Sequence, residues 1–251
     1  MSLETGPSPD PPTAHVGPAA DPFGWIAEPT AELLALLDAE RGYYESRIAS
    51  LAALRSALAA EMTARVPAVS ESAPWRSGAF TYRLTHRPGT EFPALTRTAL
   101  ECGQEVLIDL QRVADAHPGA EFHPGELRVS PDGMALAWSA DVVGDERYRL
   151  RFRDVRTGSD LPEVIEATFP DGAWSADAST YLYLRTDAVN RPFQVWAHRL
   201  GTDPTSDRLV FEEPDQRFEL TVEATRSGSW LVITATSRDT SEAHLLPAAD
   251  P

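Results

Sequence analysis

The spacing of hydrophobic and polar residues changes once along the chain, near Pro67. Before this point apolar residues recur every three or four positions, which is typical of one face of a helix; they include Ile48, Leu51, Leu54, Leu58 and Met62. Thr30 is a suitable N-cap, and Glu32 falls in the first turn. The pattern therefore predicts a helical segment from Thr30 to about Val66, with a bend at Gly42. An apolar stripe of this kind usually packs on a partner surface, because two helices that are polar on their other faces bury little core between them.

After Pro67 the chain is predicted to form short strands separated by turn residues, as in an all-β fold. The stretch RVSPDGMALAWSADVVGDERYRLRFRDVRTG, residues 128–158, shows the arrangement. We expect three successive strands here, over residues 127–130, 134–139 and 147–155. The first two are joined by a tight turn, for which Pro131 presets the backbone and Gly133 tolerates the exit geometry.

This strand–turn–strand arrangement occurs four times along the chain. The turn centres lie near Gly78, Asp132, Asp177 and Ser227, so they are about 54, 45 and 50 residues apart. Repeats of roughly 40–50 residues, each made of about four strands, are typical of β-propeller blades. The stretch from Pro67 onward has room for about four such blades.

The fold class predicted is mainly β, with an N-terminal helical arm preceding a partial β-propeller of about four blades. Residues 1–20 are rich in Pro, Ala, Gly and Ser and are expected to form a disordered tail. Residues 21–66 would form the helical arm, and residues 67–251 the partial propeller. Two interpretations stay open, because a four-bladed ring is at the lower limit of propellers and an unclosed ring exposes sheet edges. The chain forms either a compact small propeller or part of a larger one.

Composition narrows the classes of partner. The 251 residues carry a formal net charge of −16, which argues against nucleic acid and against an anionic membrane. The acidity permits cationic ligands, but it is also common in cytosolic proteins. Cys102 is the only cysteine, which excludes an internal disulfide and a cysteine-based zinc site. No secretory leader or run of about 18 apolar residues is present, so a cytoplasmic location is predicted.

Candidate catalytic chemistry is sparse. The sequence contains no G-x-S-x-G nucleophile elbow, P-loop or dinucleotide fingerprint, and its serines fall in turns or at strand edges. His117 and His123 are six positions apart, a spacing that matches no compact metal motif. His198 is expected to pack beside Trp196 as a satisfied strand residue. We therefore predict no catalytic, cofactor-binding or metal-ligating residue in this chain, and no cofactor.

Two further patterns each have a functional and a structural interpretation. Arginines alternate along one predicted strand, at Arg147, Arg149, Arg151 and Arg153, and would project from one face. They could bind phosphate, but we favour a solvated outer strand paired with acidic neighbours such as Asp145, Glu146 and Asp154. Tryptophans on or beside the strands are expected to pack between blades rather than to stack on bases; they are Trp75, Trp138, Trp174, Trp196 and Trp230.

Three motifs carry a family resemblance. They are DPFGWI (21–26), VSPDGMALAWSADVVGDERYRLRFRDVRTG (129–158) and YLYLRTDAVNRPFQVWAHRLGTDPTSDRLVFEEPDQRFEL (181–220). Together they resemble the prolyl oligopeptidase family, and oligopeptidase B in particular. The resemblance covers roughly residues 21 to 246.

The resemblance implies a seven-bladed propeller that follows a helical segment and precedes a C-terminal α/β-hydrolase domain holding the Ser, Asp and His of the triad. This chain would then end within the fourth blade, and no catalytic residue can be assigned in it. It is predicted to be the N-terminal region of an oligopeptidase B-like serine-type endopeptidase and to be inactive alone. In the family the propeller restricts access to short peptides, and cleavage follows Arg or Lys. The helical arm would pack on the hydrolase domain.

Two alternatives remain at this point. The chain could be a stand-alone, non-catalytic propeller that binds a partner, although the sequence after Ser237 offers little beyond EAHLLP for a last strand. It could also be an inactive partner that docks onto a full-length homologue through residues 30–66.

Overall fold

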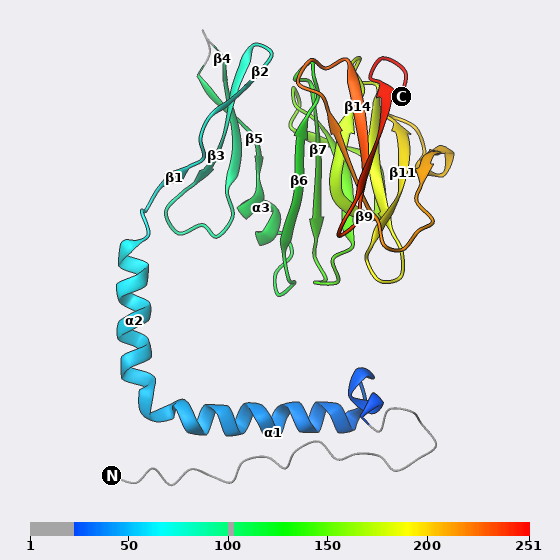
Figure 1. Ribbon diagram of the computed structural model, residues 1–251. Helices are drawn as coiled ribbons and strands as arrows, with labels where there is room; N and C mark the ends of the chain where they lie inside the picture. Colours follow the sequence, from blue (N-terminus) through cyan, green and yellow to red (C-terminus); the bar gives the residue numbers. More distant parts are fainter. Residues whose placement is uncertain (1–22, 100–102) are drawn as a thin grey trace. The chain divides into compact units, whose positions relative to one another are not determined.

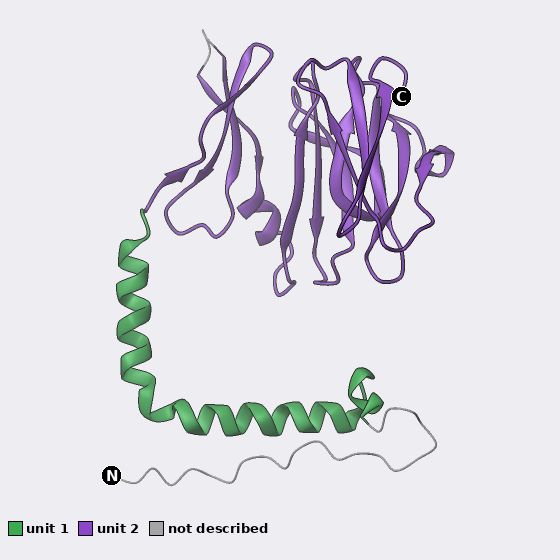
Figure 2. Cartoon of the chain, in the orientation of Figure 1, with its two compact units in different colours: residues 1–67 green, residues 68–251 purple. Residues whose placement is uncertain are grey.

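The computed structural model describes residues 23–99 and 103–251. The chain divides after Pro67 into two compact units, which Figure 2 shows in different colours. The predicted disordered tail, residues 1–20, lies outside the described residues, as does Cys102. Each unit is described by itself.

The first unit is helical. It contains a 3₁₀ turn η1 (Gly24–Ala27), helix α1 (Ala31–Ile48), a 3₁₀ turn η2 (Ala49–Leu51) and helix α2 (Ala52–Arg65). Thr30 caps α1 as predicted, because its side-chain oxygen accepts a hydrogen bond from the Leu33 N–H at 3.2 Å. The bend predicted at Gly42 is wrong: α1 continues through this residue and is interrupted only at η2. A single glycine weakens a helix by about 1 kcal/mol, which is too little to end it.

The apolar stripe predicted for this unit is present and exposed. The exposed large apolar side chains along the helices are Leu34, Leu37, Tyr44, Leu51, Leu54, Leu58 and Met62. No residue of α1 or α2 is buried. The helices therefore keep an apolar surface available for packing.

The second unit is made of antiparallel sheets, shown in Figure 1. The first sheet contains β1 (Ser70–Glu71), β2 (Trp75–Ser77), β3 (Phe80–His86), β4 (Ala94–Ala99) and β5 (Gln104–Asp109). Both β1 and β2 pair with β3, so they act together as the first strand of a four-stranded blade. A short helix, α3 (Leu110–Asp115), follows β5.

The next seven strands form one continuous hydrogen-bonded sheet in sequence order. They are β6 (His123–Val129), β7 (Ala135–Asp141), β8 (Tyr148–Asp154), β9 (Ser159–Trp174), β10 (Thr180–Thr186), β11 (Pro192–Arg199) and β12 (Arg208–Glu212). The sheet comprises two blades, because the 16-residue strand β9 pairs with β8 through its first half and with β10 through its second half. Ala167, at φ 56°, marks the change of direction between the halves.

The last sheet contains β13 (Glu219–Ala224), β14 (Trp230–Thr236) and β15 (Ser241–Pro247), in that order. It is the fourth consecutive meander of the second unit. The described strands thus form four successive blades, and the prediction of a mainly β, partial propeller preceded by a helical arm is confirmed.

The repeated turns are stabilised by serine and aspartate side chains. Ser130 Oγ donates to Asp132 Oδ1 at 2.5 Å and accepts from the Ala135 N–H at 2.9 Å. Ser175 repeats this one blade later, donating to Asp177 at 2.7 Å and accepting from the Thr180 N–H at 3.0 Å. These serines therefore close the hairpins between the first and second strands of their blades.

The core lies between the blades, in three apolar clusters. The first joins blades one and two through Tyr82, Leu95, Leu136 and Trp138. The second joins blades two and three, and includes Phe152, Trp174 and Tyr181. The third joins blades three and four, and includes Leu184, Val195, Leu220 and Ile233. Each fully buried large side chain contributes about 1.5–3 kcal/mol of transfer free energy, so these contacts hold the blades together.

The tryptophan prediction is confirmed only in part. Trp138 and Trp174 are buried between blades, and Trp196 packs half-buried against the second cluster. Trp75 and Trp230 are 42% and 44% exposed, on the first and fourth blades. Sequence position alone did not distinguish these two sites from the buried ones.

Candidate functional site on the inner strands

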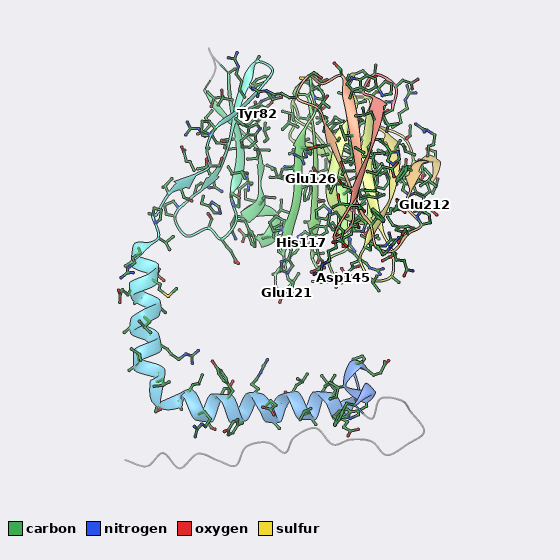
Figure 3. All side chains as sticks on the ribbon, viewed as in Figure 1. Tyr82, His117, Glu121, Glu126, Asp145 and Glu212 are labelled. Atoms are coloured by element: carbon green, nitrogen blue, oxygen red, sulfur yellow. The ribbon has the colours of Figure 1, made fainter. Side chains whose placement is uncertain are left out.

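The first strands of consecutive blades lie beside one another. Strand β6 contacts β9, which in turn contacts β13, and Asp171 in the second half of β9 takes part in both contacts. In a β-propeller the blades surround a central channel, and their first strands are innermost. Side chains on these strands are therefore the ones that a molecule in the channel would meet. Figure 3 shows Glu126 on β6.

A polar network connects three blades through these strands. Glu126 Oε2 accepts a hydrogen bond of 2.6 Å from the Tyr181 hydroxyl on β10, and Glu126 Oε1 forms an ion pair with Arg128. Arg128 Nη2 lies 3.6 Å from Asp171 Oδ1 on β9. Asp171 Oδ2 accepts from the Val222 N–H on β13 at 3.0 Å. The network thus runs from the second blade to the fourth.

Burial changes the charge properties of this network. Desolvation raises the pKa of Glu126 to about 7, against the opposing effects of the Tyr181 hydrogen bond and the Arg128 charge. Desolvation also raises the pKa of Asp171, even though Val222 and Arg128 stabilise its charged form. Arg128 remains half exposed, with 52% of its side chain accessible. The inner surface therefore presents the guanidinium group of Arg128 beside the carboxyl groups of Glu126 and Asp171. Of these carboxyl groups, that of Glu126 titrates near neutral pH.

Two glycines make this packing possible. A Cβ added at Gly172 would lie 2.4 Å from the Tyr181 hydroxyl oxygen, and one added at Gly125 would lie 2.3 Å from Ser139 Oγ. Both distances are too short for a real side chain, so these inner strands need glycine. A glycine inside a strand is the sequence signal of such a close approach, and it could have indicated this site.

A second buried polar cluster lies between blades two and three, centred on His198. His198 Nδ1 is 2.8 Å from Asp207 Oδ1, and Nε2 is 3.9 Å from Glu163 Oε1 on β9. Tyr183 donates to Asp207 Oδ2 at 2.9 Å, and the Gly201 N–H donates to Glu163 at 2.8 Å. His198 is a buried strand residue as expected, but only its Nδ1 is satisfied, since Nε2 has no hydrogen-bond partner within the described residues. The imidazole also stacks on Phe152, with ring centroids 5.1 Å apart. Packing from the neighbouring blade determines this contact.

Two other histidines, His117 and His123, make separate local contacts. His117 Nδ1 is 2.9 Å from the Val113 carbonyl oxygen, as expected for a local helix-end contact. His123 Nε2 lies 3.9 Å from Glu121 Oε2 on the surface. In residues 23–99 and 103–251, no group of three or more His, Cys, Asp or Glu side chains is arranged to hold a metal ion.

The arginine strand is not an outer strand. β8 lies between β7 and β9, and its Leu150 and Phe152 are buried while the arginines occupy the opposite face. Arg149 pairs with Glu166 at 3.0 Å and Arg153 with Asp160 at 2.7 Å, both on β9. The expected partners near β8 in sequence are thus wrong, because cross-strand neighbours supply the carboxylates.

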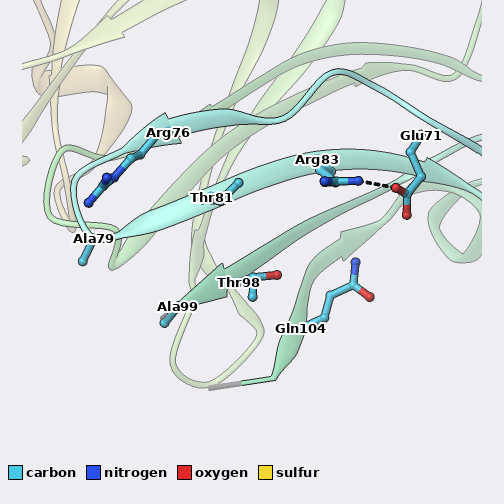
Figure 4. A pocket seen from close by; sticks show the side chains of 8 residues that line it. All are labelled: Glu71, Arg76, Ala79, Thr81, Arg83, Thr98, Ala99 and Gln104. Atoms are coloured by element: carbon cyan, nitrogen blue, oxygen red, sulfur yellow. Dashed lines mark hydrogen bonds and ion pairs between the residues drawn. The ribbon is translucent and has the colours of Figure 1, made fainter. Parts of the chain in front are cut away.

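The first blade carries a polar hollow of about 550 Å³, seen in Figure 4. It is lined by Glu71, Arg76, Ala79, Thr81, Arg83, Thr98, Ala99 and Gln104. Glu71 and Arg83 form an ion pair across it. The one carboxylate among the described lining residues, Glu71, is therefore held by Arg83.

Four successive antiparallel blades, with a charged network on their innermost strands, define this chain as part of a β-propeller. The model of the prolyl oligopeptidase N-terminal β-propeller domain matches residues 8–251. The chain belongs to this family.

Curated relatives are similar to nearly the whole chain. An uncharacterized peptidase of Sinorhizobium fredii is 31% identical over 253 residues, which cover 94% of this chain and 32% of the relative. Protease 2 of Moraxella lacunata is 27% identical over 253 residues, covering 97% of this chain and 36% of the relative. The chain thus spans about a third of the length of the curated relatives it matches.

Solved structures show the same fold. Oligopeptidase B from Leishmania major superposes with a TM-score of 0.85 at 24% identity, over 92% of this chain and 33% of that chain. Oligopeptidase B from Trypanosoma brucei, in a closed form with covalently bound antipain, gives a TM-score of 0.82 at 26% identity, over 98% of this chain and 35% of that chain. Within the described ranges of the present chain, no helix is long and apolar enough to cross a membrane.

Proposed function

We propose that this chain is the N-terminal region of an oligopeptidase B-like serine-type endopeptidase. Its propeller would admit short peptides to a C-terminal α/β-hydrolase domain, which would cleave after Arg or Lys. One observation carries the proposal: the relatives named as peptidases match 94–97% of this chain but only 32–36% of their own length. The catalytic triad would then lie in the part of the protein that follows the propeller.

The charge of the chain supports short cationic peptides as substrates. A formal net charge of −16 attracts cations over long distances and increases their rate of encounter. On the inner strands the carboxyl groups of Glu126 and Asp171 are largely buried and paired with Arg128, so the attraction comes from the net charge of the chain. A peptide with Arg or Lys side chains would therefore meet a favourable field as it approached the channel.

The exposed apolar side chains of the helical arm support the proposal that a hydrolase domain is attached. Its exposed large apolar side chains recur from Leu34 to Met62 along both helices. An apolar surface of this extent is typical of a packing interface. We assign it to the hydrolase domain of the same protein; docking onto a separate full-length homologue is the alternative.

The proposal also includes a cytoplasmic location. The single cysteine, Cys102, is in keeping with a reducing compartment. Fractionation of source cells, followed by blotting for this region, would test the location. Recovery of the protein only outside the cytoplasmic fraction would contradict it.

The first experiment is to measure the mass of the endogenous polypeptide with an antibody against residues 68–251. We expect a species that is several hundred residues longer than the 251-residue chain, whose mass is 27.4 kDa. That species should hydrolyse a short arginyl or lysyl chromogenic peptide, whereas the 251-residue chain should not. A band at 27.4 kDa, or activity of the purified chain that persists after repurification, would overturn the proposal.

A further inference from the structure

A groove lies between the first and second blades, on the side away from the inner strands. It has a volume of about 520 Å³ and is bounded by β5 and α3 on one side and by β8 and the start of β9 on the other. His117, labelled in Figure 3, is one of its lining residues. The groove is separate from the polar network on Glu126.

Apolar side chains form the floor of this groove. Leu107, Ile108 and Trp138 are buried beneath it, and Val113 of α3 lines its wall. Val106, on the edge strand β5, is 55% exposed. Because Leu107, Ile108 and Trp138 are at most 5% exposed, the apolar area open to a ligand comes from exposed Val106 and half-buried Val113.

The rim of the groove carries more cations than anions. It contains three arginines, Arg112, Arg151 and Arg153, and two aspartates, Asp109 and Asp160. The groove lining thus has a net charge of +1 before His117 is considered, in a chain whose formal net charge is −16.

Both aspartates already have cationic partners. Asp109 pairs with Arg87, which lies outside the lining. Asp160 accepts hydrogen bonds from Arg153 at 2.7 Å and from the Trp138 indole N–H at 3.1 Å. The guanidinium groups of Arg112 and Arg151 have no hydrogen bond or ion pair with any residue in the ranges 23–99 and 103–251. These two arginines are therefore available to carboxylates from outside.

We propose that this groove binds an acidic peptide segment of a partner protein, with its carboxylates on Arg112 and Arg151 and its apolar side chains on the apolar floor at Val106 and Val113. Arginine favours carboxylate ligands because its planar guanidinium donates two parallel hydrogen bonds. The net charge of −16 disfavours a nucleic acid, which carries a negative charge on every nucleotide, more strongly than it disfavours a short peptide. Free phosphate would leave the apolar floor unused. The site goes beyond the proposed peptidase function, whose substrates are cationic.

The test is an NMR titration of the ¹⁵N-labelled chain with acetyl-Glu-Leu-Asp-Leu-Glu-amide. We expect saturable shifts, at peptide concentrations up to about 5 mM, of the Trp138 indole N–H and of the amides of β5, α3 and β8. The matched peptide acetyl-Gln-Leu-Asn-Leu-Gln-amide should bind at least tenfold more weakly. Equal binding of the two peptides, or shifts that do not saturate, would overturn the proposal.

Variants separate the groove from general electrostatics. Arg112→Glu and Arg151→Glu should each weaken binding of the acidic peptide at least tenfold. Arg147→Glu makes the same charge change on an exposed arginine outside the groove, so it should change the affinity less than twofold. If Arg147→Glu weakens binding as much as the groove variants do, the groove is not the site. Arg112→Gln and Arg151→Gln repeat the test if a charge reversal impairs folding, which the dispersion of the spectrum reports.

Inorganic phosphate provides the last arm of the test. We expect phosphate at the same concentration to shift fewer groove amides and to compete poorly with the acidic peptide. Phosphate that reproduces the peptide's shifts and displaces it at equal concentration would indicate a simple anion site. That result would contradict the role of the apolar floor.

Discussion

Tyr181 donates a hydrogen bond of 2.6 Å to Glu126, joining the third blade to the second although 55 positions separate the two residues in sequence. Burial raises the pKa of Tyr181 well above its usual range, so its hydroxyl remains a donor at physiological pH. Burial also raises the pKa of Glu126 to about 7. In this contact between blades the Tyr181 hydroxyl therefore keeps its proton, whereas the Glu126 carboxyl group loses its proton near neutral pH.

Glu126 makes the stability of the propeller depend on pH. Its pKa in the folded chain, about 7, is above the value of 4.5 for an unperturbed glutamate. Between these values the folded chain binds more protons than the unfolded chain, so the free energy of unfolding falls as pH rises from about 4.5 to 7. The full loss is roughly 3 kcal/mol at most. We expect Glu126→Gln to abolish this part of the dependence, so that the variant is more stable than the parent at pH 8 and similar to it at pH 5.

Urea unfolding at the two pH values, followed by tryptophan fluorescence, measures the effect. Glu121→Gln is the matched control, because the Glu121 side chain is 76% exposed and its removal should not change the pH dependence. A parent chain that is equally stable at pH 5 and pH 8, or a Glu126→Gln variant that is less stable at pH 8, would contradict the prediction.

Gly172 is required for the packing of the inner strand. In Gly172→Ala the new Cβ would lie within 2.6 Å of three atoms of the Tyr181 phenol, which is itself fully buried and cannot move aside. We expect a loss of about 1–3 kcal/mol in the free energy of unfolding, as for overpacking of a rigid core. Gly103→Ala is the control, since nothing lies within 4 Å of its added Cβ. Equal stability of the two variants in denaturant titrations would refute the argument.

Tyr183 supports the buried cluster between blades two and three. Tyr183→Phe removes the hydroxyl that donates to Asp207 Oδ2 at 2.9 Å and leaves this carboxylate oxygen short of a donor. The expected cost is about 1–3 kcal/mol of unfolding free energy, measured by thermal and urea unfolding. Tyr148→Phe should cost less than about 0.5 kcal/mol, because within the described residues the Tyr148 hydroxyl makes no hydrogen bond. A larger effect of the Tyr148 change than of the Tyr183 change would count against the cluster.

The first helix should gain stability when Gly42 is replaced. Gly42 lies within α1, and nothing lies within 4 Å of an added Cβ there. In a synthetic peptide of residues 30–66, Gly42→Ala should increase the helical circular dichroism signal, because alanine favours a helix over glycine by about 1 kcal/mol. A decrease in the helical signal would contradict the prediction, because it would mean that Gly42 favours this helix more than alanine does.

The periodicity of the sequence was enough to predict the elements. Strand hairpins around Asp132 and Asp177 depend on residues next to each other in the chain, and the Thr30 cap depends on contacts three positions away. Local chemistry of this kind is written directly in the sequence. The exception is Gly42, where a locally weak residue was overruled by the helix on either side of it.

The polar sites required the tertiary structure. Glu126 meets Tyr181, and His198 meets Phe152, only because neighbouring blades pack face to face. The arginines of β8 find Glu166 and Asp160 on the adjacent strand rather than the acidic residues beside them in sequence. In the sequence, the available sign of these close contacts was the presence of Gly125 and Gly172 within strands. A glycine in a strand does not identify the side chain that approaches it.

By itself, then, the sequence determined the helical arm, the repeated hairpins and the family resemblance, since each depends on residue order and local spacing. The tertiary structure decided which charged groups are buried, which are paired and which remain available, as in the groove at Arg112 and Arg151. The physical reason is that burial and pairing depend on distances between strands remote in sequence, and these distances are fixed only when the blades pack together.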